Sequence, residues 1–327
     1  MQATLASNIQ NDSASGVYKV NSLLIHADAD PLLGDVTWDP WRSLWNAGML
    51  LSALVLGPLY FTWGAFAVCV ILLELTMCAG HSVGFHRRLI HRTFNCPKWV
   101  ERLLVWSGTL VGMHGPLWVI QSHDLRDWAQ RQLECHPYLR HGQGMLKDAF
   151  WSLHCRLKLK KAPGFDPGPG IADDPFYRFL QRTWMLQQIP VALILYAIGG
   201  VPWVVWGVCV RVALGVSMHW FVGYICHSHG PQSWLVNNGE VQAHNVPWAA
   251  LPSMGESWHN NHHAFPASAR HGLYPGQVDI GFRFVQLLEY VGLASDIKTP
   301  DKLPMREGIT AVAPDARAAL GQRMPSL

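Results

Sequence analysis

Histidine is the residue type whose spacing points to chemistry, and the 327-residue chain has 17 of them. His259, His262 and His263 stand in the motif HNNHH, and a spacing of i, i+3 and i+4 places three imidazoles on one helix face. Three such imidazoles repel one another when protonated and add little to packing, so metal ligation is the simplest explanation. A lone histidine is usually structural, whereas this cluster favours a metal site.

Two further histidines, His86 and His91, are five positions apart, which on an ideal helix separates them by about 140°. They therefore serve either two metals or one metal across a distorted helix. His227 follows a long apolar run and is expected at the same membrane–water boundary as His86. An imidazole-rich site without cysteine ligands suits iron that handles O2 better than structural zinc. The expected reaction is abstraction from an unactivated C–H bond of a lipid chain.

The elements that must position these histidines are two long uncharged segments. Residues 43–73 contain no charged side chain over 31 positions, and residues 183–210 contain none over 28. A single helix of 31 residues would be about 46 Å long, whereas the hydrocarbon core of a bilayer is roughly 30 Å thick. Gly57-Pro58 with Gly64 breaks the first segment, and glycine and proline at 199–202 break the second. The pattern predicts two hairpins of transmembrane helices, at about 44–61, 64–84, 180–198 and 202–226.

The composition supports a membrane protein and excludes other classes. Hydrophobic residues make up 50% and charged residues 14% of the chain, whereas a soluble domain carries roughly 25% charge. This excludes a disordered chain and a nucleic-acid surface that depends on charge density. Seven scattered cysteines without a CxxC pair argue against a disulfide framework. Basic flanks at 86–92 and 156–161 predict that the histidine clusters and both termini face the cytoplasm.

The expected fold class is an all-α integral membrane protein, in which four transmembrane helices carry a cytosolic helical cap. Residues 1–43 are expected to form a flexible arm, 44–302 a single domain, and 303–327 a weakly ordered tail. Two ionisable residues, Glu74 and Arg211, lie within the apolar segments. Because such groups are costly in a bilayer unless paired, one hypothesis is that they form an ion pair; the alternative is that each stands alone.

These motifs together resemble the membrane fatty acid desaturases, in particular the acyl-CoA type. The resemblance is carried by GFHRRLIHRTF at 84–94, GPLW at 115–118 leading to His123, and GESWHNNHHAFPASARHGL at 255–273, and it extends from about residue 66 to 280. It implies a di-iron centre held by nine histidines and an acyl chain in a buried tunnel. The implied metal ligands are His86, His91, His123, His227, His259, His262 and His263. The resemblance also implies that Trp258, Asn260 and Asn261 support the site.

The second histidine motif departs from the family pattern HRxHH. Here Arg126 and Asp127 stand where two histidines are expected, and Gly223 replaces an asparagine four positions before the single histidine. A guanidinium cannot ligate a metal but a carboxylate can, so Asp127 is a candidate ligand. Whether the site holds two irons, one iron or a different bridging arrangement stays open. Three spare imidazoles are alternatives, each more simply explained as structural: His114, His136 and His219.

The leading interpretation is O2-dependent desaturation of a long fatty acyl chain, bound as acyl-CoA or acyl-lipid. One alternative is a membrane lipid hydroxylase of the same superfamily, and another is a degenerate, non-catalytic lipid-binding relative. The sequence contains no cytochrome b5-like or ferredoxin-like segment, so a separate protein of one of these kinds is expected to supply electrons. Membrane lipid is the other expected partner, and no nucleic-acid partner is expected.

Overall fold

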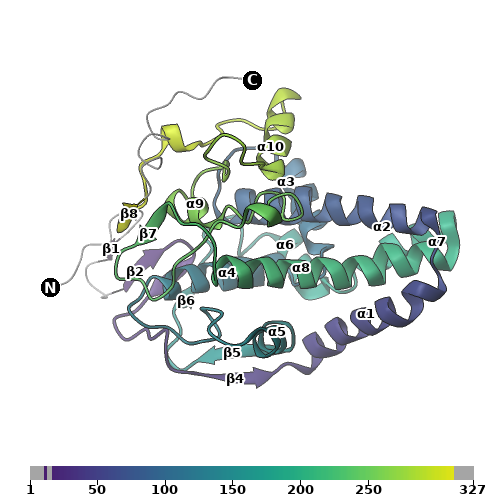
Figure 1. Cartoon of the computed structure of the whole chain (residues 1–327), viewed down its shortest axis with the longest axis horizontal. Helices are drawn as coiled ribbons and strands as arrows, with labels where there is room; N and C mark the ends of the chain where they lie inside the picture. Colours follow the sequence, from purple (N-terminus) through teal and green to yellow (C-terminus); the bar gives the residue numbers. More distant parts are fainter. Residues whose placement is uncertain (1–10, 13–16, 313–327) are drawn as a thin grey trace.

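Two long apolar helical stretches dominate the described part of the chain, which comprises residues 11–12 and 17–312 of a computed structural model. By length and composition, Trp63–Ile90 and Gln188–Cys226 are able to cross a membrane. With the preceding helix, their elements are α1 (Pro40–Leu59), α2 (Trp63–Leu75), the π-helical η1 (Thr76–Ile90), α7 (Gln188–Val204), the π-helical η2 (Val205–Val210) and α8 (Arg211–Cys226). Figure 1 shows these helices extending from the end of the molecule where the other elements gather.

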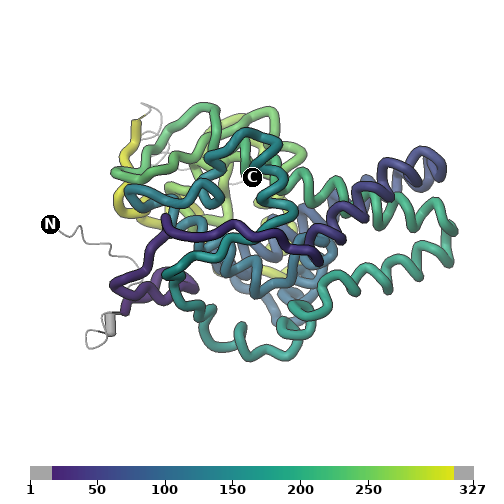
Figure 2. Tube along the Cα trace, turned by 90° about the horizontal axis from the view of Figure 1, so that it is seen from below, coloured from purple at the N-terminus to yellow at the C-terminus, as the bar shows by residue number. Residues whose placement is uncertain are grey.

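The breaks between these helices have local causes. The side chain of Asp39 caps the start of α1, which continues through Pro58 to its end at Leu59, and the side chain of Thr62 caps the start of α2. The break at residues 60–62 lies between Gly57-Pro58 and Gly64, the residues predicted to supply it. Within the range of α7, Gly200 has a non-helical backbone with φ of 66°, a conformation that glycine adopts without strain. The chain turns there, and η2 packs beside α7 (Figure 2).

The other helices cover the end of the molecule that contains the histidines. They are α3 (Lys98–Thr109), α4 (Pro116–Gln130), α5 (Met145–His154), α6 (Pro175–Thr183), the 3-10 helix η3 (Pro247–Ala249), α9 (His259–Ala264), α10 (Ile280–Tyr290) and the 3-10 helix η4 (Pro300–Lys302). α3 packs closely on η1 because glycines remove side chains from the contact. A Cβ built on Gly80 would lie 2.4 Å from the Gly108 amide nitrogen, and one on Gly84 would lie 2.5 Å from the Leu104 carbonyl oxygen.

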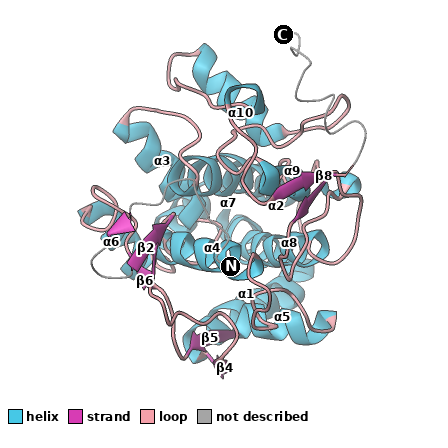
Figure 3. Cartoon of the chain, turned by 90° about the vertical axis from the view of Figure 1, so that its left-hand side faces the viewer, coloured by secondary structure: helices cyan, strands magenta, loops and turns pink. Residues whose placement is uncertain are grey.

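Short antiparallel strands lie around these helices, so the predicted all-α class is correct only for the dominant helices. One sheet has the order β1-β2-β3-β6, and two further pairs join β4 to β5 and β7 to β8. The strands are β1 (Asn11–Asp12), β2 (Val17–Val20), β3 (Leu23–Ile25), β4 (Gly34–Trp38), β5 (Cys155–Leu159), β6 (Gly164–Phe165), β7 (Trp234–Val236) and β8 (Ile309–Ala311). Figure 3 shows them at the periphery of this end.

The strands change the interpretation of both terminal segments. Residues 17–38, predicted as part of a flexible arm, contain β2, β3 and β4, and the side chains of Leu23 and Ile25 are buried in the core. Residues 309–311, predicted within a weakly ordered tail, form β8 and pair with β7. The remainder of the predicted tail, from residue 313, lies outside the described residues, as do residues 1–10 and 13–16.

The predicted ion pair between Glu74 and Arg211 is wrong. Arg211 is 1% exposed, and its guanidinium donates to the carbonyl oxygens of Gly207 at 2.7 Å and Leu110 at 2.6 Å, and to the side chain of Gln188. Glu74 forms no ion pair in residues 17–312. Backbone carbonyls and an amide oxygen satisfy the buried cation in place of a carboxylate.

Candidate metal centre

All seven predicted histidine ligands fall into two groups. The first cluster comprises His86, His91, His123 and His262, and the second cluster comprises His227, His259 and His263. Within each cluster, the potential ligand atoms all lie within 4.8 Å of one another. The two clusters adjoin, because α9 contributes His262 to the first and both His259 and His263 to the second.

A π-helix brings together the first two ligands of the first cluster. The amide of His91 donates to the carbonyl oxygen of His86 at 3.1 Å, an i to i+5 bond, and the two ring centroids are 4.8 Å apart. Of the two alternatives that the spacing allowed, the structure therefore has the distorted helix. His123 of α4 lies with its ring centroid 4.8 Å from that of His91, and the ring of His262 lies 4.5 Å from that of His86.

A carboxylate with a side chain only 13% exposed orients the first cluster. The Nδ1–H of His86 donates to Glu256 Oε2 at 2.5 Å, which leaves Nε2 available to a metal. Glu256 also accepts hydrogen bonds from Ser82 Oγ at 2.6 Å and from the fully buried guanidinium of Arg87. Although burial raises the pKa of Glu256, His86 and Arg87 hold that pKa well below its ordinary value. The carboxylate is therefore ionised and fixed.

In the second cluster, a backbone carbonyl rather than a carboxylate orients the histidine ligand His227. His227 ends α8, and its Nδ1–H donates to the Gly223 carbonyl oxygen at 2.8 Å. The Nε2 atoms of His259 and His263 are 3.1 Å apart, and the ring of His227 lies 4.7 Å from that of His259. Burial lowers the pKa of His259 well below 6.5 and that of His263 to about 4, so both imidazoles are neutral and keep a lone pair for a metal.

The residues of both clusters fit a metal ion. His91 Nε2, His262 Nδ1 and His227 Nε2 are buried without a hydrogen-bond partner. Leaving a buried polar atom unsatisfied costs about 1–3 kcal/mol, so three such atoms converging on two clusters are explained by ligation. Imidazole-rich donor sets of this kind suit iron, copper, nickel or zinc.

Comparison with known proteins identifies the family. The fatty acid desaturase family model matches residues 61–275. The chain belongs to the fatty acid desaturase family. It is 34% identical over 278 residues to an acyl-CoA C20 Δ5-desaturase of Anemone leveillei, which covers 82% of this chain and 87% of that protein.

The names of two further relatives describe desaturases of lipid-linked acyl chains. A chloroplastic palmitoyl-monogalactosyldiacylglycerol Δ7 desaturase of Arabidopsis thaliana is 35% identical over 283 residues, covering 82% of this chain and 73% of the relative. An sn-1 stearoyl-lipid 9-desaturase of Synechocystis sp. is 35% identical over 261 residues, covering 78% and 79%. The relatives thus include acyl-CoA and acyl-lipid desaturases, so they support a desaturase without selecting the acyl-CoA type.

The two departures from the family's second histidine motif are bound to partners outside the clusters. Arg126 Nη1 donates to the Leu139 carbonyl oxygen at 3.2 Å and to His141 Nε2 at 3.0 Å. Both carboxylate oxygens of Asp127 accept from Arg306, at 2.8 and 2.6 Å. Asp127 is in neither cluster, so its predicted ligand role stays a prediction.

His141 fills the space beside Gly223. A Cβ built on Gly223 would lie 3.5 Å from His141 Nε2, and the His141 ring stacks on that of His227 with centroids 5.5 Å apart. The Nδ1–H of His141 donates to the buried carboxylate of Asp148 at 2.8 Å. The imidazole therefore occupies the side of His227 that a longer residue at position 223 would reach.

The predicted supporting residues hold α9 in place. Trp258 is buried and precedes the helix as its N-cap residue. Asn260 accepts from the backbone amide of Trp234 at 3.0 Å and donates to the carbonyl oxygen of the same residue at 2.7 Å. Asn261 donates to the His271 carbonyl oxygen at 2.9 Å. These bonds fix the short helix against β7 and the segment that follows it.

The spare imidazoles belong to neither cluster. His114 stacks on Trp118 with ring centroids 4.1 Å apart, and His136 Nδ1 accepts from a backbone amide two residues on. His219 Nδ1 lies 3.1 Å from His81 Nε2. Sequence reasoning missed His271, whose Nδ1 accepts from Arg87 at 3.1 Å and which forms a third possible group with His86 and Glu256. Its only signal was its place within the third motif.

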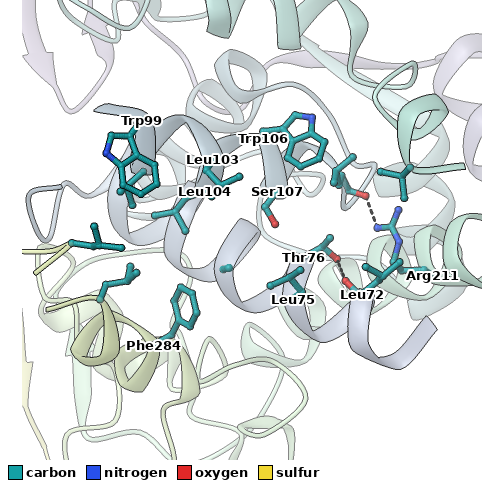
Figure 4. Close-up of a pocket in the computed structure, with 16 residues that line it drawn as sticks. Leu72, Leu75, Thr76, Trp99, Leu103, Leu104, Trp106, Ser107, Arg211 and Phe284 are labelled. Carbon is teal, nitrogen blue, oxygen red and sulfur yellow. Dashed lines mark hydrogen bonds between the residues drawn. The ribbon is translucent and has the colours of Figure 1, made fainter. Parts of the chain in front are cut away.

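An apolar cavity of about 330 Å³ lies between α2, η1, α3 and α10 (Figure 4). Its wall includes Leu72, Leu75, Trp99, Leu103, Leu104 and Phe284. The polar side chains at its edge face the protein: Thr76 Oγ1 donates to the Leu72 carbonyl oxygen, and Arg211 to that of Leu110.

Proposed function

We propose that this chain is a membrane-embedded desaturase that introduces a C=C bond into a long fatty acyl chain with O2, using the two histidine clusters as a di-iron centre. The observation that carries the proposal is the pair of adjoining imidazole clusters, with buried unpartnered nitrogens, in a member of the desaturase family. The overall reaction takes one O2, two electrons and two protons, removes two hydrogen atoms from adjacent carbons and releases two waters. When bound, iron supplies the activation of O2.

The residues of the chain have separate tasks in this proposal. The four imidazoles of the first cluster and the three of the second hold the metals. Glu256 fixes the tautomer and orientation of His86, and Arg87 holds Glu256 ionised. The hydrogen bond from His227 to the Gly223 carbonyl does the same for the second cluster. His86, His262 and His263 are buried, and the other four imidazoles are half-buried, so access of bulk water to the clusters is restricted, which limits side reactions of a reactive oxidant.

The apolar cavity beside η1 is a suitable binding site for a hydrocarbon chain. Ala79 lines it and lies seven residues before His86 on the same helix. We propose that this cavity takes part of the acyl chain. Ala79→Leu, which fills the cavity, should shorten the longest chain that is converted, and Leu75→Ala should lengthen it. An unchanged chain-length profile in both variants would assign the cavity to another lipid.

The proposed topology has four membrane crossings with the histidine clusters on the cytoplasmic side. The four are α1, α2 with η1, α7, and η2 with α8, separated by the turns at 60–62 and Gly200. Phe61 and Val201 lie near these turns and are 43% and 42% exposed. Phe61→Cys and Val201→Cys should react with an impermeant thiol reagent only from the side opposite to Lys158→Cys. Labelling of all three from one side would reject the topology.

The activity is tested by expression in a host of defined lipid composition, together with a ferredoxin- or cytochrome b5-like electron donor. Gas chromatography of the fatty acids should show a new monounsaturated chain that is lost without the donor. His262→Ala, which removes a ligand, should abolish it, whereas His26→Ala, at an exposed position outside both clusters, should not. A hydroxylated chain would indicate a hydroxylase, and a metal-free chain with no product a non-catalytic relative.

A further inference from the structure

The carboxylate of Asp127 is the acidic group beside the second cluster that the family pattern does not explain. Asp127 lies four residues after His123 on α4, a spacing that places both on one helix face. The residue is 9% exposed, and its two oxygens accept from Nη1 and Nη2 of Arg306 at 2.8 and 2.6 Å. This two-pronged arrangement is the strongest form of carboxylate–guanidinium contact. It uses the two oxygens that a metal would otherwise coordinate.

Arg306 reaches this position because its segment is attached at three places. We call residues 303–312 the C-terminal latch. Its Arg306 amide donates to the carbonyl oxygen of Ala264, the residue after His263, at 2.9 Å. Arg131 of α4 donates to the carbonyl oxygen of residue 307 at 2.9 Å, and β8 pairs with β7. The latch therefore holds the guanidinium between α4 and α9, the helices that carry Asp127 and His263.

The Asp127–Arg306 pair connects the two helices that carry the histidine ligands. Asp127 is one helical turn after His123 on α4, and the Arg306 amide is bonded to the residue that follows His263 of α9. Against the effect of burial, Arg306 holds the pKa of Asp127 well below its ordinary value. The ionised carboxylate is therefore bound by the guanidinium of Arg306, and Arg131 is a further cation near it.

We propose that Arg306 withholds the Asp127 carboxylate from the second cluster, so that this cluster binds its divalent metal through three imidazoles alone. Loss of the guanidinium makes Asp127 the fourth protein ligand. A guanidinium and a metal ion compete for the same two oxygens, because both bind a carboxylate through its lone pairs. The inference rests on the metal centre of the proposed function, and it makes the C-terminal latch a determinant of metal affinity.

The test measures metal binding by the purified full-length chain in lipid nanodiscs. The chain is stripped of metal and titrated with Co²⁺ against a competing chelator, and the visible absorption of Co²⁺ reports its coordination. Arg306→Met should strengthen the weaker of two binding steps by about tenfold, in line with the effect of groups that position ligands. The gain should disappear in the double variant Arg306→Met with Asp127→Asn.

A neighbouring arginine supplies the matched control. Arg131 also acts on the charge of Asp127 and contacts the latch, but it donates to the residue 307 carbonyl rather than to the carboxylate. Arg131→Met removes the same charge and should leave the weaker step unchanged. An equal gain in Arg131→Met would show a general charge effect and overturn the proposal. So would an unchanged affinity in Arg306→Met, or a gain that persists with Asp127→Asn.

A second variant keeps the proposal testable where Arg306→Met does not fold. Asp127→His supplies an imidazole, which cannot accept two hydrogen bonds from the guanidinium as a carboxylate does. The weaker of the two Co²⁺-binding steps should therefore strengthen with Arg306 intact. An unchanged affinity there would also overturn the proposal. These results are independent of turnover. A chain that desaturates with unchanged affinities contradicts the inference alone, and a chain with the expected affinities that makes no alkene contradicts only the proposed function.

Discussion

The two histidine clusters use the same ligand type but differ in how acidic groups are placed beside them. In the first cluster, Glu256 accepts the Nδ1–H of His86 and is itself held by Arg87. In the second, His227 is oriented by a backbone carbonyl, and the nearby Asp127 is bound entirely by Arg306. A carboxylate behind a histidine ligand raises the basicity of that ligand. The first cluster is therefore expected to hold its metal more tightly than the second.

The arginines of the two clusters accordingly have opposite effects. Arg87 keeps a carboxylate ionised and directed at a ligand, and its other contacts include Asp279 at 2.8 Å and the Ala269 carbonyl at 2.8 Å. Arg306 neutralises a carboxylate that would otherwise face the cluster. An arginine–carboxylate pair thus supports metal binding at the first cluster, because Glu256 is bonded to a ligand. In the second cluster such a pair limits metal binding, because the Asp127 carboxylate is taken up by Arg306.

The largest effect is expected from breaking the support of the first cluster. Arg87 is fully buried, so Arg87→Met leaves Glu256 and Asp279 without a cation and should lower the free energy of unfolding by about 3–5 kcal/mol. The adjacent Arg88 pairs with Glu101, and its side chain is 18% exposed. Arg88→Met should cost less, about 1 kcal/mol, because Glu101 keeps its contacts with Lys98 and Tyr177.

Chemical unfolding of both variants, followed by tryptophan fluorescence in one detergent, measures the difference. Equal losses of stability in the two variants would mean that the contacts of Arg87 with Glu256 and Asp279 contribute no more than the contact of Arg88 with Glu101.

Acidification should affect the metal-free second cluster through His263. The pKa of His263 is lowered from 6.5 to about 4, chiefly by burial, so the unfolded chain binds a proton there that the folded chain does not. Stability from this residue is complete above the unfolded pKa and is lost as the pH falls from 6.5 toward 4. In His263→Asn, the slope of unfolding free energy against pH should be shallower in that range by about 1.4 kcal/mol per pH unit.

Unfolding curves at half-unit pH steps for both proteins test this expectation. Parallel slopes would mean that His263 takes up a proton in the folded protein as readily as in the unfolded chain.

Removing the carboxylate behind His86 should weaken the first cluster more than the second. Glu256→Gln keeps the shape of the side chain but removes its charge, so affinity in the tighter binding step should fall by about 10- to 100-fold. The effect of Asp127→Asn on the tighter step should be small, because Asp127 is bound to Arg306. Competition with a chelator measures both. A larger loss in Asp127→Asn would reverse the assignment of the tighter step to the first cluster.

The parts of the site that local spacing encodes could be predicted from the sequence, and those that depend on distant contacts could not. HNNHH forms a short helix, as the i, i+3 and i+4 pattern predicted, but the pattern did not reveal that His262 joins one cluster while His259 and His263 join the other. The five-residue spacing of His86 and His91 left two alternatives, because no local pattern announces a π-helix. Glu256 and Arg306 were not assigned their partners, since 170 and 179 positions separate them from His86 and Asp127.

The same distinction applies to the fold. The uncharged runs predicted the long apolar helices, because burial in lipid needs no partner from elsewhere in the chain. The strands at 17–38 were missed because β4 pairs with β5 more than a hundred positions away, and so few residues leave no clear alternation. Gly57-Pro58 with Gly64 predicted the first break because these residues are poor helix formers, and the turn at 60–62 lies between them although Pro58 itself is the penultimate residue of α1.

The smallest effect concerns the space beside His227 in the second cluster. A Cβ at position 223 would touch His141 Nε2 at 3.5 Å, so the rest of an asparagine side chain would displace the imidazole from its stack on His227. Displacing it also weakens its bond to Asp148. Gly223→Asn alone should therefore destabilise the protein by about 1 kcal/mol, whereas in a His141→Ala background it should cost little. The coupling in this double-mutant cycle should be about 0.5–1 kcal/mol. Additive effects would show that glycine at 223 and histidine at 141 are independent. The absence of asparagine at 223 would then be unrelated to the position of His141 beside the second cluster.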